Sequence, residues 1–383
     1  MSAPHILHLI TGLGQGGAEG ALTRLVTADA THRHTVISLM DEGVQGAPLQ
    51  AAGVQVRCLG LPRGRVTPGG LRRLHGHIAE LRPDVVQTWL YHADLLGGLA
   101  GRAAGVPAVV WNLRNMDLGA DRTAWTTRLV AWLCARLSRQ LPDAIVSCSQ
   151  QALEAHAAIG YDRARMVVIP NGYDMARLAP DAATRARLRA EWGVAAGTCL
   201  VGLVGRWDAI KGHDVLLDAL AGLSRLTAIP WQAVLVGPGV DADNAVLGSW
   251  IAARGLAAQV HCLGARDDVP AVMAALDVHV LASDGEAFPN VLAEAMACGT
   301  PCVTTDVGDA ALIVGETGWV VPPRAPEALA EALAAAVAAW RDGEGWPQRQ
   351  AQARARIAER FALPAVVAQY GALWRAVAAR GIA

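Results

Sequence analysis

Two glutamates, Glu286 and Glu294, lie in the run with the strongest chemical pattern, which covers residues 283–301. Pro289 suits the first turn of a helix, and Gly299 suits its end. Glu286 therefore precedes the predicted helix, and Glu294 lies more than one turn inside it. Carboxylates in these positions can accept hydrogen bonds from sugar hydroxyls and from a ribose diol. The alternative is a helix that carries incidental acids.

The beginning of this predicted helix is a second candidate site. The first amide groups of a helix have no intrahelical acceptor, and the positive end of the helix dipole attracts anions. In this sequence those amides are near Asn290, Val291 and Leu292. The pattern predicts an anion-binding site at this point.

A loop with two cations, Arg206 and Lys211, follows another predicted strand. Two such charges suit a diphosphate and can neutralise the charge that develops on a departing phosphate. Of the 33 lysines and arginines, Lys211 is the one lysine. Because an ammonium group differs chemically from a guanidinium group, we expect Lys211 to have a functional role. A solvated loop with ordinary charges is the alternative.

Glycines dominate the segment Thr11–Glu19, which precedes a helix predicted over Ala21–Ala28. Glycines let a backbone approach an anion, and the following helix offers amide donors. The segment also matches the dinucleotide fingerprint, with Asp41 near the position of the carboxylate that binds an adenosine ribose. A tight turn without a ligand is the alternative.

These loops follow short apolar runs that alternate with helical segments, which is the pattern of parallel sheets covered by helices. The predicted strands of the first half are His5–Ile10, His34–Met40, Val54–Leu59, Val85–Thr88, Ala108–Trp111, Ala144–Cys148 and Val167–Ile169. Those of the second half are Cys199–Val204, Gln232–Val236, Val260–Leu263, Val278–Leu281, Cys302–Thr304 and Gly318–Val321. The expected fold is α/β, with two Rossmann-like domains.

The domain boundary is expected between Asn171 and Thr198, where a turn, an arginine-rich helix and two glycines occur. The predicted domains are residues 1–175 and residues 195–360. The tail, 364–383, has apolar residues on one helical face, so it is an amphipathic helix that docks elsewhere.

Composition excludes several classes of protein. The 383 residues are 53% hydrophobic, which suffices for two cores, and a net charge of -1 gives no electrostatic basis for nucleic-acid binding. Seven scattered cysteines indicate free thiols in a reducing compartment. With no signal peptide and no membrane-spanning run, the expected location is the cytoplasm.

The motifs together resemble glycosyltransferase family 4, whose GT-B fold implies that the two domains face a central cleft. The resemblance covers nearly the whole chain in the expected order. It rests on the following features: Glu286 and Glu294, Arg206 and Lys211, the loop with Gly16 and Gly17, the run Ile169–Asp174, and the segment Gln87–Asp94 with His92.

The resemblance implies a retaining transferase that moves a hexosyl group from a nucleoside-diphosphate sugar to a glycan or lipid-linked acceptor. It implies that Glu286 contacts the transferred sugar, Glu294 the ribose, and the Arg206–Lys211 pair the diphosphate. It also implies that His92 faces the donor sugar, that no metal is needed, and that residues 364–383 cross back to the N-terminal acceptor domain. Many relatives have glycine after the first glutamate and Phe-Gly two residues later, whereas Glu286 is followed by Ala-Phe-Pro-Asn. The donor is therefore left open, with UDP favoured and GDP second.

Other features have two interpretations each. Arg114 and Asn115 follow the predicted strand Ala108–Trp111 and are candidates for acceptor contact or for a structural turn. Trp125 and Trp132 share one side of a helix near Thr123–Arg139 with three arginines, which suits either a membrane interface at the inner face of the cytoplasmic membrane or ordinary packing. Competing functions are a sugar-nucleotide epimerase, an NAD-dependent oxidoreductase and a non-catalytic binding module.

Overall fold

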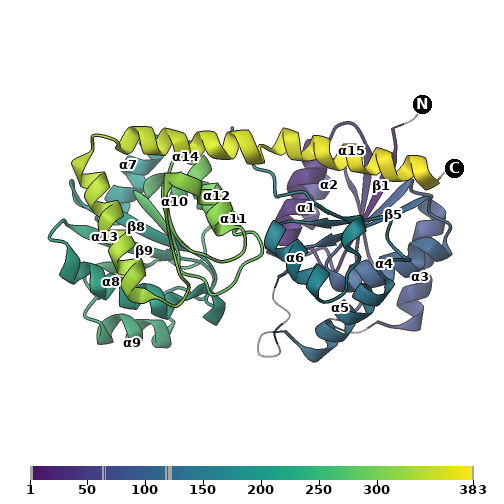
Figure 1. Cartoon of the computed structure of the whole chain (residues 1–383), viewed down its shortest axis with the longest axis horizontal. Helices are drawn as coiled ribbons and strands as arrows, with labels where there is room; N and C mark the ends of the chain where they lie inside the picture. Colours follow the sequence, from purple (N-terminus) through teal and green to yellow (C-terminus); the bar gives the residue numbers. More distant parts are fainter. Residues whose placement is uncertain (1–2, 63, 65, 117–118, 120–122, 382–383) are drawn as a thin grey trace. The chain divides into compact units, whose positions relative to one another are not determined.

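The computed structural model describes residues 3–62, 64, 66–116, 119 and 123–381. The chain forms two compact units, one of Met1–Gly172 with Leu363–Ala383 and the other of Tyr173–Ala362. Each unit contains one parallel sheet with flanking helices (Figure 1). The α/β fold class with two Rossmann-like units, as predicted from the sequence, is confirmed.

The first unit contains β1 (His5–Ile10), α1 (Gly17–Ala28), β2 (Arg33–Ser38), α2 (Gly46–Ala51), β3 (Gln55–Cys58), α3 (Pro68–Leu81), β4 (Val85–Trp89), α4 (Tyr91–Ala103), β5 (Ala108–Leu113), α5 (Trp125–Leu137), β6 (Ala144–Ser147), α6 (Gln150–Ala158), η1 (Arg163–Arg165), β7 (Met166–Val168) and the final helix α15 (Leu363–Gly381). Its strand order is β3-β2-β1-β4-β5-β6-β7.

The second unit contains α7 (Ala182–Glu191), β8 (Cys199–Val204), η2 (Ala209–Lys211), α8 (His213–Leu226), β9 (Trp231–Val236), α9 (Ala245–Ala253), β10 (Val260–Cys262), α10 (Val269–Ala275), β11 (Val278–Leu281), α11 (Asn290–Ala297), β12 (Cys302–Thr305), α12 (Ala310–Val314), η3 (Gly315–Thr317), β13 (Trp319–Val321), α13 (Pro326–Asp342) and α14 (Trp346–Phe361). Its strand order is β10-β9-β8-β11-β12-β13.

Both sheets reverse their strand order at one place, between β1 and β4 in the first unit and between β8 and β11 in the second. In an open parallel sheet, ligands bind beyond the carboxyl ends of the strands at such a switch point. The loop with Lys211 follows β8, and the loop with Glu286 follows β11. The fold therefore brings the two strongest sequence motifs to the switch point of the second sheet.

An aspartate before a strand joins neighbouring strands at the amino edge of the first sheet. The Asp84 carboxylate accepts a hydrogen bond from the amide of His5 at 2.7 Å, and the Asp143 carboxylate accepts one from the amide of Val109 at 2.8 Å. The amide of each aspartate in turn donates to the carbonyl of the same partner. These paired bonds hold the register of the strands that carry the candidate loops.

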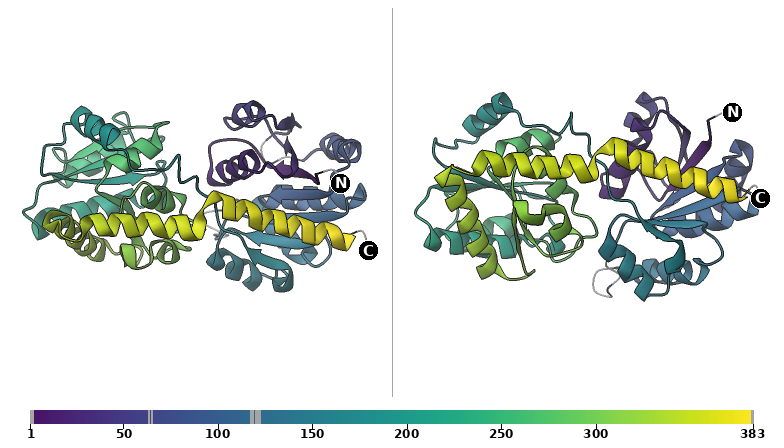
Figure 2. Two further views of the ribbon diagram at one scale, coloured as in Figure 1. Left: turned by 90° about the horizontal axis from the view of Figure 1, so that it is seen from above. Right: turned by 45° about the horizontal axis from the view of Figure 1, so that its top comes forward.

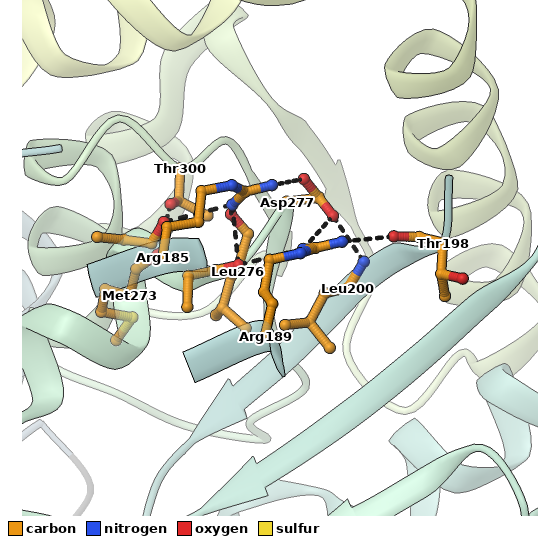
Figure 3. A network of polar contacts seen from close by, with 10 residues as sticks. Arg185, Arg189, Thr198, Leu200, Met273, Leu276, Asp277 and Thr300 are labelled. Atoms are coloured by element: carbon orange, nitrogen blue, oxygen red, sulfur yellow. Dashed lines mark hydrogen bonds and ion pairs between the residues drawn. The ribbon is translucent and has the colours of Figure 1, made fainter. Parts of the chain in front are cut away.

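Asp277, which precedes β11, joins β11 to β8 in the same way, and it also binds two arginines of α7 (Figure 3). Its carboxylate accepts from the amide of Leu200 at 2.7 Å and from Arg189 at 2.8 Å, and it pairs with Arg185. Arg185 also donates to carbonyl groups at the end of α10. These bonds fasten α7 to the second unit, so residues 173–194, which the sequence analysis left largely between domains, belong to that unit.

The final helix, α15, belongs to the first unit, where it contacts α1 and β5 (Figure 2). Its buried face supplies Val366, Tyr370, Trp374 and Val377 to the core. The indole Nε1 of Trp374 donates to Gln87 at 3.0 Å, and the Tyr370 hydroxyl accepts from Asn112 at 3.0 Å. Apolar packing and specific polar contacts thus fix this helix to the strands β4 and β5.

A buried histidine is expected to make the stability of the second unit dependent on pH. His279 of β11 is fully buried, its ring nitrogens have no hydrogen-bond partner among the described residues, and burial lowers its pKa to about 3. Below pH 6.5, about the pKa of an unfolded histidine, the unfolded chain binds a proton at this position and the folded chain does not. The unfolding free energy therefore falls by up to about 1.4 kcal/mol per pH unit. We expect His279→Leu to reduce the loss of unfolding free energy between about pH 7 and pH 5, measured by urea titration. The exposed His75→Leu is the control, and equal pH dependence in wild type and H279L would contradict this account.

Candidate functional site

The loops after β8 and β11 lie against each other at the switch point of the second sheet. The amide of Asp284 donates to the carbonyl of Ile210 at 2.8 Å, which joins the two loops directly. Gly212 has a φ of +64°, and a Cβ there would lie 2.1 Å from the carbonyl oxygen of Ala282. Glycine therefore permits both the left-handed turn and the close approach of the loops.

Lys211 and Glu286 form an ion pair in this place. The Lys211 Nζ lies 2.5 Å from the Glu286 Oε1, and the side chains are 19% and 16% exposed. The Ser283 hydroxyl donates to the same Oε1 at 3.0 Å. The structure therefore unites two residues predicted from separate motifs, a cation for a phosphate and a carboxylate for a sugar.

Arg206 is held differently, because its guanidinium is exposed and folds onto Asp208 of the same loop. Its Nε and one terminal nitrogen lie 3.0 and 2.7 Å from the Asp208 Oδ2. Asp208 also accepts from the amide of Ile210 at 3.1 Å. Burial raises the pKa of Asp208, but the hydrogen bonds from Ile210 and Arg206 outweigh it, so the net pKa is lowered. Arg206 and Lys211 thus bind different carboxylates, and a shared diphosphate requires Arg206 to reorient.

Helix α11 begins at Asn290, directly after Pro289, so Pro289 precedes the helix rather than occupying its first turn. The amide of Leu292 donates to the Pro289 carbonyl at 3.1 Å. The prediction that the Leu292 amide is unpaired is therefore wrong, and anion binding near Asn290, Val291 and Leu292 stays a prediction. The Asn290 side chain accepts from the Tyr173 hydroxyl at 2.6 Å. Glu294 is half-buried within α11, and its ribose contact stays a prediction.

Gly308, which the sequence analysis did not single out, supports Glu286 from the loop after β12. Its φ is +52°, and a Cβ there would lie 2.2 Å from the Glu286 carbonyl oxygen. The fold alone brings the two residues together, and no local motif indicates it.

We expect Gly308→Ala to lower turnover by about 10- to 100-fold, because misplacing a substrate-positioning group by about 1 Å has that effect. Steady-state kinetics with the donor would measure it. Gly193→Ala is the matched control, since Gly193 has a φ of +67° but open space around its missing Cβ. Equal turnover in both variants would show that Gly308 does not position Glu286.

In the first unit, the glycine loop follows β1 and leads into α1. This helix begins at Gly17 rather than at the predicted Ala21, and Gly16 precedes it in an extended conformation. The Glu19 carboxyl folds back over this point, since its Oε2 would lie 2.4 Å from a Cβ at Gly16. Burial raises the pKa of Glu19, more than a hydrogen bond to its own backbone lowers it. A carboxyl therefore lies at the helix start, where an anionic ligand would bind.

Asp41, which supported the dinucleotide interpretation, is used locally. Its carboxylate accepts from the amide of Gly43 at 3.2 Å. A Cβ at Gly43 would lie 2.2 Å from the Leu13 carbonyl oxygen, so this turn packs against the glycine loop. The structural role of Asp41 weakens the case for a ribose contact.

His92 lies in the first turn of α4, after β4. The preceding Leu90 has a φ of +74°, a strained conformation for a branched residue, and such strain concentrates at functional sites. The Leu90 amide donates to the Asn112 carbonyl at 3.2 Å. Burial lowers the pKa of His92, which favours a neutral ring at neutral pH. The predicted role of His92 is thus consistent with its place at the switch point of the first sheet.

Arg114, a candidate for acceptor contact, is engaged within the first unit. It donates to Tyr370 of α15 at 2.8 Å and to Asn171, and its guanidinium lies 4.5 Å from the centre of a Trp89 ring. This arrangement favours the structural interpretation. Asn115 is exposed, and its acceptor role stays a prediction.

The expectation that no metal is needed has one feature against it, the sequence Asp241-Ala-Asp243 before α9. Carboxylates spaced in this way can bind a divalent cation. In the structure the Asp241 carboxylate accepts from the Asp243 amide at 3.2 Å, an ordinary turn. Among the described residues, no group of three or more histidine, cysteine, aspartate or glutamate side chains is arranged to hold a metal.

A cavity of about 510 Å³ lies near the amino edge of the second sheet. The loops with Lys211 and Glu286 instead follow the carboxyl ends of its strands. Its lining includes Arg185, Arg354 and Asp277. Both arginines donate to main-chain carbonyls, and Arg185 also pairs with Asp277. The charges of this cavity are thus used to hold helices, and the switch point is the better candidate for the reaction.

Comparison with known proteins defines the class. A crystal structure of Anabaena Alr3699/HepE in complex with UDP is similar over 97% of this chain and 99% of its own, with a TM-score of 0.84 and 25% identity. Residues 15–177 match the model of Glycosyltransferase Family 4, and residues 198–339 match that of Glycosyl transferases group 1. The protein is a glycosyltransferase of the GT-B type.

Curated relatives define the family. The glycosyltransferase EpsF of Bacillus subtilis is 30% identical over 321 residues, which is 80% of each chain. A D-inositol 3-phosphate glycosyltransferase of Rhodococcus erythropolis is 34% identical over 203 residues, 51% of this chain and 46% of the relative. The chain belongs to glycosyltransferase family 4, as its motifs predicted.

Proposed function

We propose that the protein moves a hexosyl group from a nucleoside-diphosphate sugar to a glycan or lipid-linked acceptor, with retention of configuration and without a metal. UDP is the favoured nucleotide and GDP the second. The Lys211–Glu286 pair carries this proposal, because it places a phosphate-binding cation beside a carboxylate that can bind sugar hydroxyls. Alr3699/HepE, crystallised with UDP and with UDP-glucose, supports the choice of UDP.

In the proposed reaction, the bond from the anomeric carbon to the diphosphate oxygen breaks while the acceptor oxygen bonds on the same face. The acceptor proton passes to the departing phosphate oxygen. Lys211 stabilises the charge on that phosphate, and Glu286 positions the sugar through its hydroxyls. Arg206 is a second candidate for this role, once it leaves Asp208.

The test is donor hydrolysis and transfer with UDP-, GDP- and ADP-sugars in excess chelator. We expect release of UDP from UDP-sugars to be fastest and to persist in chelator, because Arg206 and Lys211 supply the charge that a metal would supply. Activity that disappears in chelator and returns with magnesium or manganese would contradict the metal-free account, and Asp241→Asn would then identify the ligand.

The same assay separates the competing functions. An epimerase would change the sugar of the nucleotide without releasing UDP. An oxidoreductase would reduce NAD and leave UDP-sugars intact. Either result would overturn the proposal.

A further inference from the structure

Helix α5 of the first unit presents large apolar side chains to solvent. Trp125 is 73% exposed, Trp132 is 48% exposed and Leu129 is 47% exposed. The helix packs inward through Ala131, Cys134 and Ala135, and Val130 and Leu137 pack, partly buried, against the same core. Large apolar side chains therefore lie on both faces of this helix, and Trp125, Leu129 and Trp132 are the ones that face solvent.

The exposed side chains form one stripe. Positions 125, 129, 132 and 136 follow the helical repeat, so they share a face. Arg128 and Arg136 are exposed on this face, and Arg139 follows beyond the end of the helix. Helix α5 contains no aspartate or glutamate. We call the set Trp125, Arg128, Leu129, Trp132, Arg136 and Arg139 the α5 stripe.

Charge and apolar surface are combined within the α5 stripe. The Arg136 guanidinium lies 4.9 Å from the centre of a Trp132 ring. An arginine held against an indole can lie at the level of lipid headgroups while the ring enters the acyl boundary.

We propose that the α5 stripe binds the surface of an anionic lipid bilayer, with the helix in the plane of the interface. Tryptophan favours this interface, and arginine is attracted by anionic headgroups. A second copy of the chain fits less well, because a symmetric contact would bring arginines together without a carboxylate on the stripe. No helix of the described residues is long and apolar enough to cross a membrane. The inference goes beyond the proposed reaction and does not depend on it.

The experiment is co-sedimentation of the full chain with vesicles of phosphatidylcholine, with or without phosphatidylglycerol. We expect binding to the anionic vesicles and its decrease with added salt. The variant Trp125→Ser/Trp132→Ser and the variant Arg128→Gln/Arg136→Gln/Arg139→Gln should each bind about tenfold more weakly or worse. The control is Leu226→Ser/Val246→Ser, which removes two exposed apolar side chains of the second unit and should bind like wild type.

Thermal unfolding and UDP affinity check that the stripe variants remain folded, and light scattering reports their oligomeric state. Wild-type binding that is absent, or that is equal with and without phosphatidylglycerol, would overturn the proposal. So would stripe variants that bind vesicles as well as wild type. A stripe variant that turns a dimer into a monomer, without loss of vesicle binding, would assign the stripe to a second copy.

Discussion

Replacing Lys211 by alanine is expected to lower turnover by more than about tenfold, because loss of one such charge removes about 2–4 kcal/mol of transition-state stabilisation. The structure adds a second reason. Without the ammonium, Glu286 remains largely buried with no cation beside it, next to the position proposed for an anionic diphosphate. We therefore expect weaker donor binding as well. Steady-state kinetics with saturating acceptor would measure both effects.

The control for Lys211→Ala is Arg225→Ala, which removes an exposed positive charge at the other end of α8. This variant should turn over like wild type. Lys211→Arg keeps the charge but changes its geometry, so partial activity is expected. Near-normal turnover of K211A would remove Lys211 from the mechanism.

Removing the charge of Glu286 and removing that of Glu294 are expected to change different kinetic constants. Glu294→Gln should mainly raise the Michaelis constant for the donor and weaken the affinity for free nucleoside diphosphate, since a ribose contact contributes to binding throughout the reaction. Glu286→Gln should mainly lower turnover, because its bonds to the sugar strengthen as positive charge grows on the ring.

The Lys211–Glu286 ion pair adds an expectation about how Glu286→Gln affects the affinity for nucleoside diphosphate. In E286Q the ammonium loses its carboxylate and is available to the diphosphate, so nucleoside diphosphate affinity should be unchanged or higher. Calorimetry with UDP alongside kinetics of each variant would measure this. If E286Q loses UDP affinity and E294Q does not, the roles of the two glutamates are reversed.

The strands were predictable because their pattern is local. Each predicted strand has a counterpart in the structure, and three have the predicted bounds, namely His5–Ile10, Cys199–Val204 and Val278–Leu281. Short apolar runs between turn residues define a buried parallel strand without knowledge of its neighbours. The amphipathic tail was predictable for the same reason, since Tyr370 and Trp374 share its buried face.

Features that depend on tertiary contacts were not predictable. In the sequence, helix α7 lies in the boundary region between the two domains. Only the structure shows that its residues Arg185 and Arg189 bind Asp277 of the second unit. Gly308 supports Glu286 because the loop after β12 packs against the loop after β11, and the spacing of residues in the sequence does not show this contact. The Leu292 amide was expected to be unpaired because a sequence does not show that the first turn of α11 closes onto Pro289.

The candidate residues were predictable by type, but their pairing was not. The sequence indicated Lys211 as a phosphate ligand and Glu286 as a sugar ligand, and the structure shows that the two side chains form an ion pair. The pairing of Arg206 with Asp208 is likewise a local contact that the motif does not show.

The central claim is that the loops after β8 and β11 hold the nucleoside diphosphate, and amide hydrogen exchange with and without UDP tests it most directly. The account predicts slower exchange on UDP addition in residues 205–213 and 286–294, and loss of this protection in E294Q. Protection confined to the glycine loop at Thr11–Glu19, with none at 286–294, would contradict it.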